Sequence, residues 1–165
     1  MKHVFLIPGV LLFSFVLLST TGFVDTQPFY GEYRPILMKR SDLEKSVSYH
    51  PDGRALTNPG KIYSHPPYIY INERYKGIHI INNADPRNPV QEGFVAAPGC
   101  IDLAVKDRIL YIDNAVDLVA FDLNAGKVTQ RIKNVFPQPP APDNTTYIGP
   151  DHDLIVVEWK KNLSL

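Results

Sequence analysis

The sequence contains a single cysteine and none of the short motifs on which many catalytic and metal sites depend. Among its 165 residues only Cys100 carries a thiol, so the chain cannot form an internal disulfide bond and its fold must be held by packing. Cys100 lies beside Ile101 in an apolar run, and we expect it to be buried as a small hydrophobic residue. No nucleophile elbow, zinc-binding helix, phosphate loop or paired-cysteine motif occurs.

The chain also lacks an excess of charge of either sign. Lysine plus arginine and aspartate plus glutamate each number 17, and no stretch concentrates one sign. A surface that binds nucleic acid or an anionic membrane needs a basic stripe. We therefore expect no nucleic-acid partner.

The N-terminal residues form a long apolar run. Lys2 and His3 precede an apolar stretch from Val4 to Leu18, which ends in small residues at 19–22. This order is typical of a secretory signal peptide, which we predict over residues 1–24. An uncleaved membrane anchor is the alternative, because the run approaches the roughly 20 residues that span a bilayer. We expect an exported protein of the periplasm, cell surface or medium, with membrane contact only if the segment is not cleaved.

The remaining chain of about 140 residues suffices for one domain with a hydrophobic core but not for two. Residues 25–59 are polar and rich in proline, and we interpret them as an N-terminal arm. Within it, the S-x-x-E spacing of Ser41 and Glu44 is a capping box that predicts a short helix from about Asp42 to Val47. A turn at 50–53 ends the helix. We assign 60–134 to two β-repeat units, 135–146 to a proline-rich connector, and 147–165 to a partial third repeat and tail.

From residue 60 onward the apolar residues follow a period of two, which predicts a mainly β fold. The runs are short, rich in β-branched and aromatic residues, and bounded by Gly, Pro, Asn or Asp. No window after residue 50 keeps a helical period. The predicted strands are 68–71, 77–81, 101–105, 109–112, 118–121 and 154–157.

The runs also repeat along the chain. The sequence PGKI at 59–62 returns as PGCI at 98–101, an offset of 39. Tyr70-Ile71 returns as Tyr111-Ile112 at an offset of 41, and the run 78–82 returns as 118–122 at an offset of 40. The C-terminal run matches 111–122 in part, at an offset of 36. A period of about 40 residues with four short strands is typical of a β-propeller blade, in which 76–90 is the third strand and the turn into the fourth.

The two units resemble the LVIVD-repeat proteins, a propeller-like family common among exported bacterial proteins. The resemblance lies in YIYINERYKGIHIINNADPRNPV and GCIDLAVKDRILYIDNAVDLVAFDL, where LVAFD corresponds to the family's namesake strand and DPRNP to its D-P-x-x-P turn. It covers about residues 58–134. The resemblance implies a propeller-like fold and supplies no catalytic residue, because the family has none established.

Two complete units and a fragment are too few for a ring, because a closed propeller needs about four to eight blades. We therefore expect an antiparallel β-repeat of two propeller-like, four-stranded blades and a partial third, forming an incomplete propeller or a small two-sheet sandwich. The strand edges would be covered by the arm and the tail, or by another copy of the chain.

Acidic residues supply the candidates for a metal site. Asp113 and Asp117 flank a hairpin loop that lacks the glycine and the distal glutamate of a calcium-binding loop. Asp151 and Asp153 enclose His152, but neighbouring residues of an extended chain point to opposite sides. For both pairs, turn residues that bond their own backbone are the simpler interpretation. We expect no cofactor, with calcium at these residues as the alternative.

Residues of the repeat units are candidates for a binding patch. Tyr68, Tyr70 and Tyr75 are expected mostly in the core and in cross-strand pairs, with alternate members available to an exposed patch. His79 alternates with isoleucines, which favours a hydrogen-bonded packing residue over a proton-transfer group. Asp102 lies in the first strand of a unit, which would line the channel of a closed ring.

The sequence therefore favours an exported, non-enzymatic β-repeat protein that acts as a binding or scaffold module of the cell envelope or extracellular space. Its partner would be a protein or a glycan, and exposed strand edges would permit self-association. A divalent-metal-dependent hydrolase of the propeller type is the alternative, and it requires Asp102, Asp113, Asp117 or Asp151 to converge on one ion. A third hypothesis is a shortened relative of a larger propeller without an activity of its own.

Overall fold

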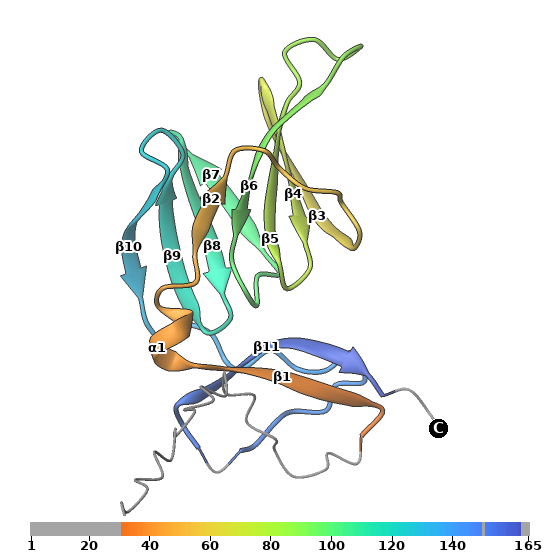
Figure 1. Cartoon of the computed structure of the whole chain (residues 1–165), viewed down its shortest axis with the longest axis vertical. Helices are drawn as coiled ribbons and strands as arrows, with labels where there is room; N and C mark the ends of the chain where they lie inside the picture. Colours follow the sequence, from red (N-terminus) through yellow and green to blue (C-terminus); the bar gives the residue numbers. More distant parts are fainter. Residues whose placement is uncertain (1–30, 150, 163–165) are drawn as a thin grey trace, which may run out of the picture.

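The computed structural model describes residues 31–149 and 151–162, which form three antiparallel β-sheets and one helical turn (Figure 1). The prediction of a mainly β, antiparallel fold is confirmed. The predicted signal peptide, residues 1–24, lies outside the described residues. Within those residues, no helical segment has the length and the apolar character needed to cross a bilayer.

The first repeat unit folds as a meander of four strands, with a fifth strand from the N-terminal arm at its edge. In the turn between the third and fourth strands, the Asp85 carboxylate accepts hydrogen bonds from the Arg87 amide and the Asn88 side chain. The strand from the arm, β2, pairs with β6, so the arm does cover one edge of this sheet. The strands are β2 (Ser48–His50), β3 (Pro59–His65), β4 (Tyr68–Glu73), β5 (Gly77–Asn82) and β6 (Val90–Ala96).

The second repeat unit is a meander of the same kind. Its last hairpin turns at Asp122, whose carboxylate accepts hydrogen bonds from the amides of Asn124 and Ala125. The predicted strands 101–105, 109–112 and 118–121 each correspond to one strand of this sheet. The strands are β7 (Leu103–Lys106), β8 (Ile109–Asn114), β9 (Asp117–Asp122) and β10 (Lys127–Ile132).

The two larger sheets pack against each other through one hydrophobic cluster. Fully burying a large apolar side chain contributes roughly 1.5–3 kcal/mol, so this cluster is the main source of stability. Cys100 is completely buried within it, as its apolar neighbours indicated. The first sheet contributes Tyr70, Ile78, Ile80 and Val95, and the second contributes Leu103, Val105, Leu110, Ile112, Val119 and Phe121.

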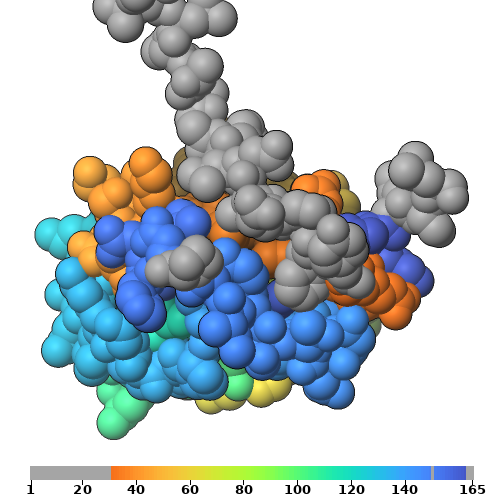
Figure 2. Space-filling view, turned by 90° about the horizontal axis from the view of Figure 1, so that it is seen from below, coloured from red at the N-terminus to blue at the C-terminus, as the bar shows by residue number. Residues whose placement is uncertain are grey.

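The arm and the tail pair with each other in a third, two-stranded sheet. β1 (Tyr33–Lys39) and β11 (Leu154–Lys161) are antiparallel and lie at one end of the two larger sheets (Figure 1). Figure 2, which views this end, shows N-terminal residues in orange beside C-terminal residues in blue. Trp159 is buried here against Ala141 and Val156, and its indole Nε1 donates to the carbonyl oxygen of Pro139 at 2.9 Å. The predicted strand at 154–157 is thus present, and its partner is the arm.

The predicted helix from Asp42 to Val47 is not formed. The structure has a single helical turn, α1 (Arg40–Leu43), and Lys39, the residue before it, makes no capping hydrogen bond with its side chain. Ser41 lies inside the turn, so the predicted capping box is absent. β1 pairs with β11 as far as Lys39, and the Arg40 amide donates to Asp153 O at 2.8 Å. Strand pairing therefore decides where the turn begins, and it overrides the local capping signal.

The strands described here do not close into a barrel or a ring. The first sheet has the order β2-β6-β5-β4-β3 and the second has the order β10-β9-β8-β7, so each has two free ends. This agrees with the expectation that two units cannot close.

Candidate functional site

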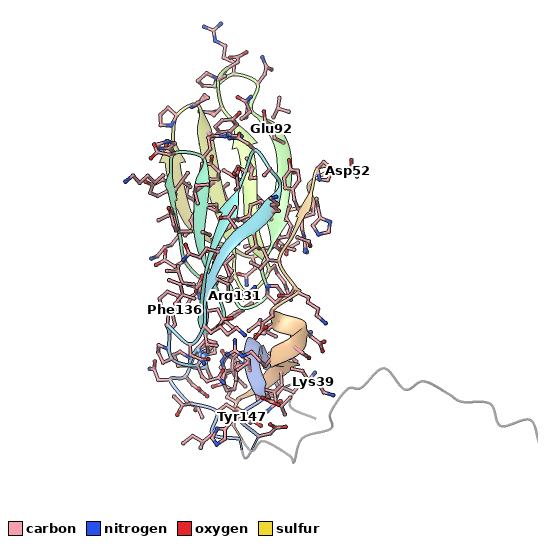
Figure 3. All side chains as sticks on the ribbon, turned by 90° about the vertical axis from the view of Figure 1, so that its left-hand side faces the viewer. Lys39, Asp52, Glu92, Arg131, Phe136 and Tyr147 are labelled. Atoms are coloured by element: carbon pink, nitrogen blue, oxygen red, sulfur yellow. The ribbon has the colours of Figure 1, made fainter. Side chains whose placement is uncertain are left out.

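The candidate site lies where the loop 51–57 crosses the first sheet. A surface cavity of about 530 Å3 is found there, within the usual range for ligand sites. Gly53 shapes the loop: its φ is +63°, and a Cβ at this position would approach the Gln91 side chain to 2.7 Å. Figure 3 shows Asp52 on this loop, at the outer side of the molecule. The cavity, here called the Arg54 cavity, is lined by His50, Asp52, Arg54, Thr57, Lys76 and Phe94.

A hydrogen-bonded network joins the loop to the sheet. Glu73 and His79 are both 1% exposed, and Glu73 Oε2 lies 3.0 Å from His79 Nε2. The other carboxylate oxygen of Glu73 accepts a hydrogen bond from the Thr57 hydroxyl at 2.5 Å. Gln91 Nε2 lies 2.8 Å from His79 Nδ1 and 3.0 Å from the backbone oxygen of Arg54. The loop is thus fixed to the sheet by side chains from both.

The contacts of Gln91 determine which nitrogen of His79 carries the proton. A backbone oxygen can only accept, so Gln91 Nε2 donates one hydrogen to Arg54 O and has the second for His79. His79 Nδ1 therefore accepts, and Nε2 donates its proton to Glu73. Both ring nitrogens are engaged inside the protein.

Arg54 compensates the buried charge of Glu73. Burial raises the pKa of Glu73, but the hydrogen bonds from Thr57 and His79 and the charge of Arg54 bring it below its ordinary value. Arg54 Nε lies 3.4 Å from Glu73 Oε2, and the guanidinium lies over the Phe94 ring, 5.1 Å from its centroid. These two contacts hold the Arg54 side chain, which is 45% exposed, at the wall of the cavity.

The Arg54 cavity therefore presents the cations Arg54 and Lys76 on a fixed support, beside the carboxylate of Asp52. Among the described residues, the ion pair of Arg54 involves its Nε, which leaves the two terminal nitrogens available to a bound anion. Lys76 lies on the same cavity and pairs with Glu158 at 2.6 Å. His50 adds a further nitrogen, and its ring lies 6.5 Å from that of Phe94. Donors of this kind suit recognition of a carboxylate, sulfate or phosphate group.

A second surface cavity, of about 440 Å3, lies beside α1 and contains two of the predicted metal ligands. Asp151 and Asp153 are both exposed there, and the Asp151 carboxylate accepts the Asp153 amide at 2.8 Å. This hydrogen bond lies within a turn, as expected for turn residues that bond their own backbone. Lys39 and Arg40 line the same cavity, and Figure 3 shows Lys39 near α1.

Asp113 and Asp117 use their carboxylates for contacts within the protein. Asp113 Oδ1 accepts the amides of Ile101 and Asp102 at 3.0 and 2.9 Å. Burial raises the pKa of Asp113, and these hydrogen bonds oppose the rise only in part. Asp117 is completely buried and pairs with Arg40 at 2.7 Å and Arg131 at 2.8 Å.

The predicted metal ligands do not come together. Within 31–149 and 151–162, no three His, Cys, Asp or Glu side chains are placed to hold one ion. The convergence of Asp102, Asp113, Asp117 and Asp151 that a hydrolase requires is therefore not seen. The expectation of no cofactor stays a prediction, with calcium as its alternative, and a thermal melt with calcium and with a chelator would test it.

The predicted binding-patch residues occupy different environments. Tyr70 is completely buried in the core, and Tyr68 packs at its margin with the Arg108 guanidinium 4.8 Å from its ring centroid. Tyr75 packs against the cluster of Ala141, Val156 and Trp159. His79 belongs to the network below the Arg54 cavity, and exposed Asp102 pairs with Lys61.

Sequence reasoning missed Arg54, Thr57 and Gln91. Arg54 and Thr57 lie in the polar arm, which has no periodic pattern, and Gln91 is an ordinary exposed strand residue. The only signal near them was the turn at 50–53, which is present: the Gly53 amide donates to His50 O at 3.3 Å.

Comparisons of the chain with models of protein families, with characterised proteins and with solved structures found no match. The resemblance to LVIVD-repeat proteins therefore rests on the repeat pattern alone and stays a prediction.

Proposed function

We propose that this protein is an exported, non-enzymatic β-repeat binding module and that the Arg54 cavity binds an anionic group of its ligand. The observation that carries the proposal is the support of Arg54, which is held between the Glu73 carboxylate and the Phe94 ring at the cavity wall. A guanidinium fixed in this way loses little conformational entropy when it binds a planar anion.

The closed network beneath the cavity supports binding over catalysis. A general base needs a free nitrogen or oxygen within reach of a substrate proton. His79 donates to Glu73 and accepts from Gln91, and it is 1% exposed. The network therefore serves to hold Arg54 and the loop in place.

The same proposal includes a finer description of the fold, in which the two repeat units are propeller-like blades. It is supported by the internal repeat of the sequence, by the meander in each unit, and by the position of the first strands β3 and β7 beside each other. Export rests on the apolar segment at 4–18 and its basic start.

Thermal melts of the full chain test the binding proposal. The probes are sodium glucuronate and sodium phosphate, with glucose as the neutral comparison and ionic strength held constant. We expect a Tm that rises with at least one anion and not with glucose, because a ligand that binds only the folded state stabilises it.

Variants locate the effect. Arg54→Ala should abolish the anion-dependent rise, and Arg54→Lys should retain part of it. Arg108→Ala is the matched control, because Arg108 lies over an aromatic ring in the same manner but outside the cavity. An equal rise in Arg54→Ala, or no rise with either anion, would contradict the proposal.

A further inference from the structure

Equivalent residues of the two repeat units lie in opposite environments. Tyr70 in β4 and Tyr111 in β8 occupy equivalent positions of the repeat, yet Tyr70 is completely buried and Tyr111 is 38% exposed. Ile112 is 1% exposed between the sheets, whereas its equivalent, Ile71, is half-buried on the outer side of the first sheet. The two sheets are therefore stacked with the same orientation. The face that one sheet turns to the core is equivalent, in the repeat, to the face that the other sheet turns outward.

The outer face of the first sheet carries a group of isoleucines. In the strand register Ile62 pairs with Ile71, and Ile69 pairs with Ile81, which places these side chains on one face. Ile62 is 68% exposed and the others are half-buried. The loop 51–57 covers the neighbouring part of this face, over His79 and Phe94. The isoleucine face is defined by Ile62, Ile69, Ile71 and Ile81.

The outer face of the second sheet is also apolar. Tyr111 pairs with Ala120, and Leu118 pairs with Ile132, which is 50% exposed. Ile109, Leu118 and Ala120 are half-buried. The tyrosine face is defined by Ile109, Tyr111, Leu118, Ala120 and Ile132.

The core of the chain already shows how two such faces fit. By the offsets of the repeat, Ile69, Ile71 and Ile81 are equivalent to Leu110, Ile112 and Phe121, which pack on the first sheet. By the same offsets, Tyr111, Leu118 and Ala120 are equivalent to Tyr70, Ile78 and Ile80, which pack on the second. The isoleucine face and the tyrosine face are thus the two sides of one internal interface, each without its partner.

We propose that a second copy of this chain places its isoleucine face on the tyrosine face of the first, and so repeats the part of the contact between the two sheets of one chain that loop 51–57 leaves uncovered. The interface joins two different surfaces, so each copy keeps one face for a further copy. Two or three copies would bring about four or six four-stranded units together, within the range in which propellers close. This inference does not depend on the ligand of the Arg54 cavity.

The test is the mass of the full chain in solution, by light scattering over a range of protein concentrations. A single chain has a mass of 18.6 kDa, and we expect a larger mass that increases with concentration. Tyr111→Lys and Ile69→Lys each place a charge in one face and should each reduce the mass to that of one chain. Ile62→Lys serves as a second isoleucine-face variant. Because Ile62 is highly exposed, this substitution should not unfold the chain.

A mixture of two variants distinguishes this interface from others. Tyr111→Lys keeps an intact isoleucine face and Ile69→Lys keeps an intact tyrosine face, so their equimolar mixture should form dimers. Ile148→Lys is the matched control, since Ile148 is 92% exposed and lies outside both faces. Circular dichroism melts confirm that each variant is folded.

Three results would overturn the inference. The first is a wild-type chain that stays at the mass of one chain at every concentration. The second is association that persists in both face variants, as it would through residues 4–18. The third is a mixture of the two variants that remains monomeric, because a contact between an isoleucine face and a tyrosine face would be restored by mixing.

Discussion

Asn72 and Asp113 occupy equivalent positions in the two repeat units, and both hold the chain that connects the two sheets. Asn72 Nδ2 donates to the carbonyl oxygen of Cys100 at 3.2 Å, and Asp113 accepts the amides of the next two residues. Buried backbone groups need such partners, because an unpaired one costs about as much as a lost hydrogen bond. At the residue scale, the connection between the units thus depends on one polar side chain from each.

Substitution of Asp113 separates the role of its oxygen from that of its charge. Asp113→Asn keeps the Oδ1 atom that accepts both amides, and it removes the charge of a carboxyl group whose pKa is raised by burial. The free energy of unfolding at pH 7 should therefore be unchanged or slightly higher. Asp113→Ala leaves two amides without this acceptor and should cost about 1–3 kcal/mol. Urea unfolding at pH 7 measures both. An Asn variant as unstable as the Ala variant would show that the charge itself is required.

At the scale of elements, one carboxylate joins the arm to the second sheet. Asp117 begins β9, and its carboxylate meets Arg40 from α1, Arg131 from β10 and the amide of Asn134. Figure 3 shows Arg131 at the end of the sheets that faces α1. The position of α1, and of β1 before it, therefore depends on a buried ion pair as well as on strand pairing.

The two partners of this ion pair should differ in what their removal costs. Asp117→Ala leaves both Arg40 and Arg131 without their carboxylate and should reduce the free energy of unfolding by about 3–5 kcal/mol. Arg40→Ala should cost less, because Asp117 keeps Arg131 and the Asn134 amide. Urea unfolding of the two variants at pH 7 gives the comparison. A loss from Arg40→Ala equal to that from Asp117→Ala would contradict this account of the contact.

At the scale of the whole molecule, two buried carboxylates make the free energy of unfolding depend on pH in the acid range. For Glu73 and Asp117, burial raises the pKa, but hydrogen bonds and arginine charges outweigh it, so each folded pKa lies below its ordinary value. An unfolded Asp or Glu titrates at about pH 4, so the unfolded chain binds protons first as pH falls. The stabilisation is complete above about pH 5 and is lost as pH falls through the ordinary pKa toward the folded one. Exposed carboxylates with lowered pKa contribute less, because solvent screens them.

We therefore expect the free energy of unfolding to decrease from pH 6 to pH 3. Asp117→Asn should be less stable than the wild type at pH 6 but should lose less over the same interval, because it removes one of the two buried carboxylates whose pKa is lowered in the folded state. Asp113 acts in the opposite sense, since its raised pKa favours the folded state as pH falls. Urea unfolding across this range measures the slope. The same slope in Asp117→Asn as in the wild type would exclude Asp117 as a source of the acid dependence.

The strands β4, β5, β7, β8 and β9 and the turns at 50–53 and 85–89 were predictable because their causes are local. Alternating apolar residues assign one face of a strand to the core. The carboxylates of Asp85 and Asp122 accept nearby amides in their turns, and the Gly53 amide donates to the carbonyl oxygen of His50. The site was much less predictable. His79 was named as a hydrogen-bonded packing residue, but nothing in the sequence linked it to Arg54, Thr57 and Gln91.

By itself, the sequence determined the repeat, the mainly β class and the fact that two units are too few to close, since each follows from residue order over short distances. Only the tertiary structure decided that β1 pairs with β11, that α1 begins at Arg40, and that the loop 51–57 places Arg54 over Phe94. These outcomes depend on contacts between residues far apart in the chain. The free energy of such contacts is settled by which surfaces meet in the folded chain, and no local pattern records it.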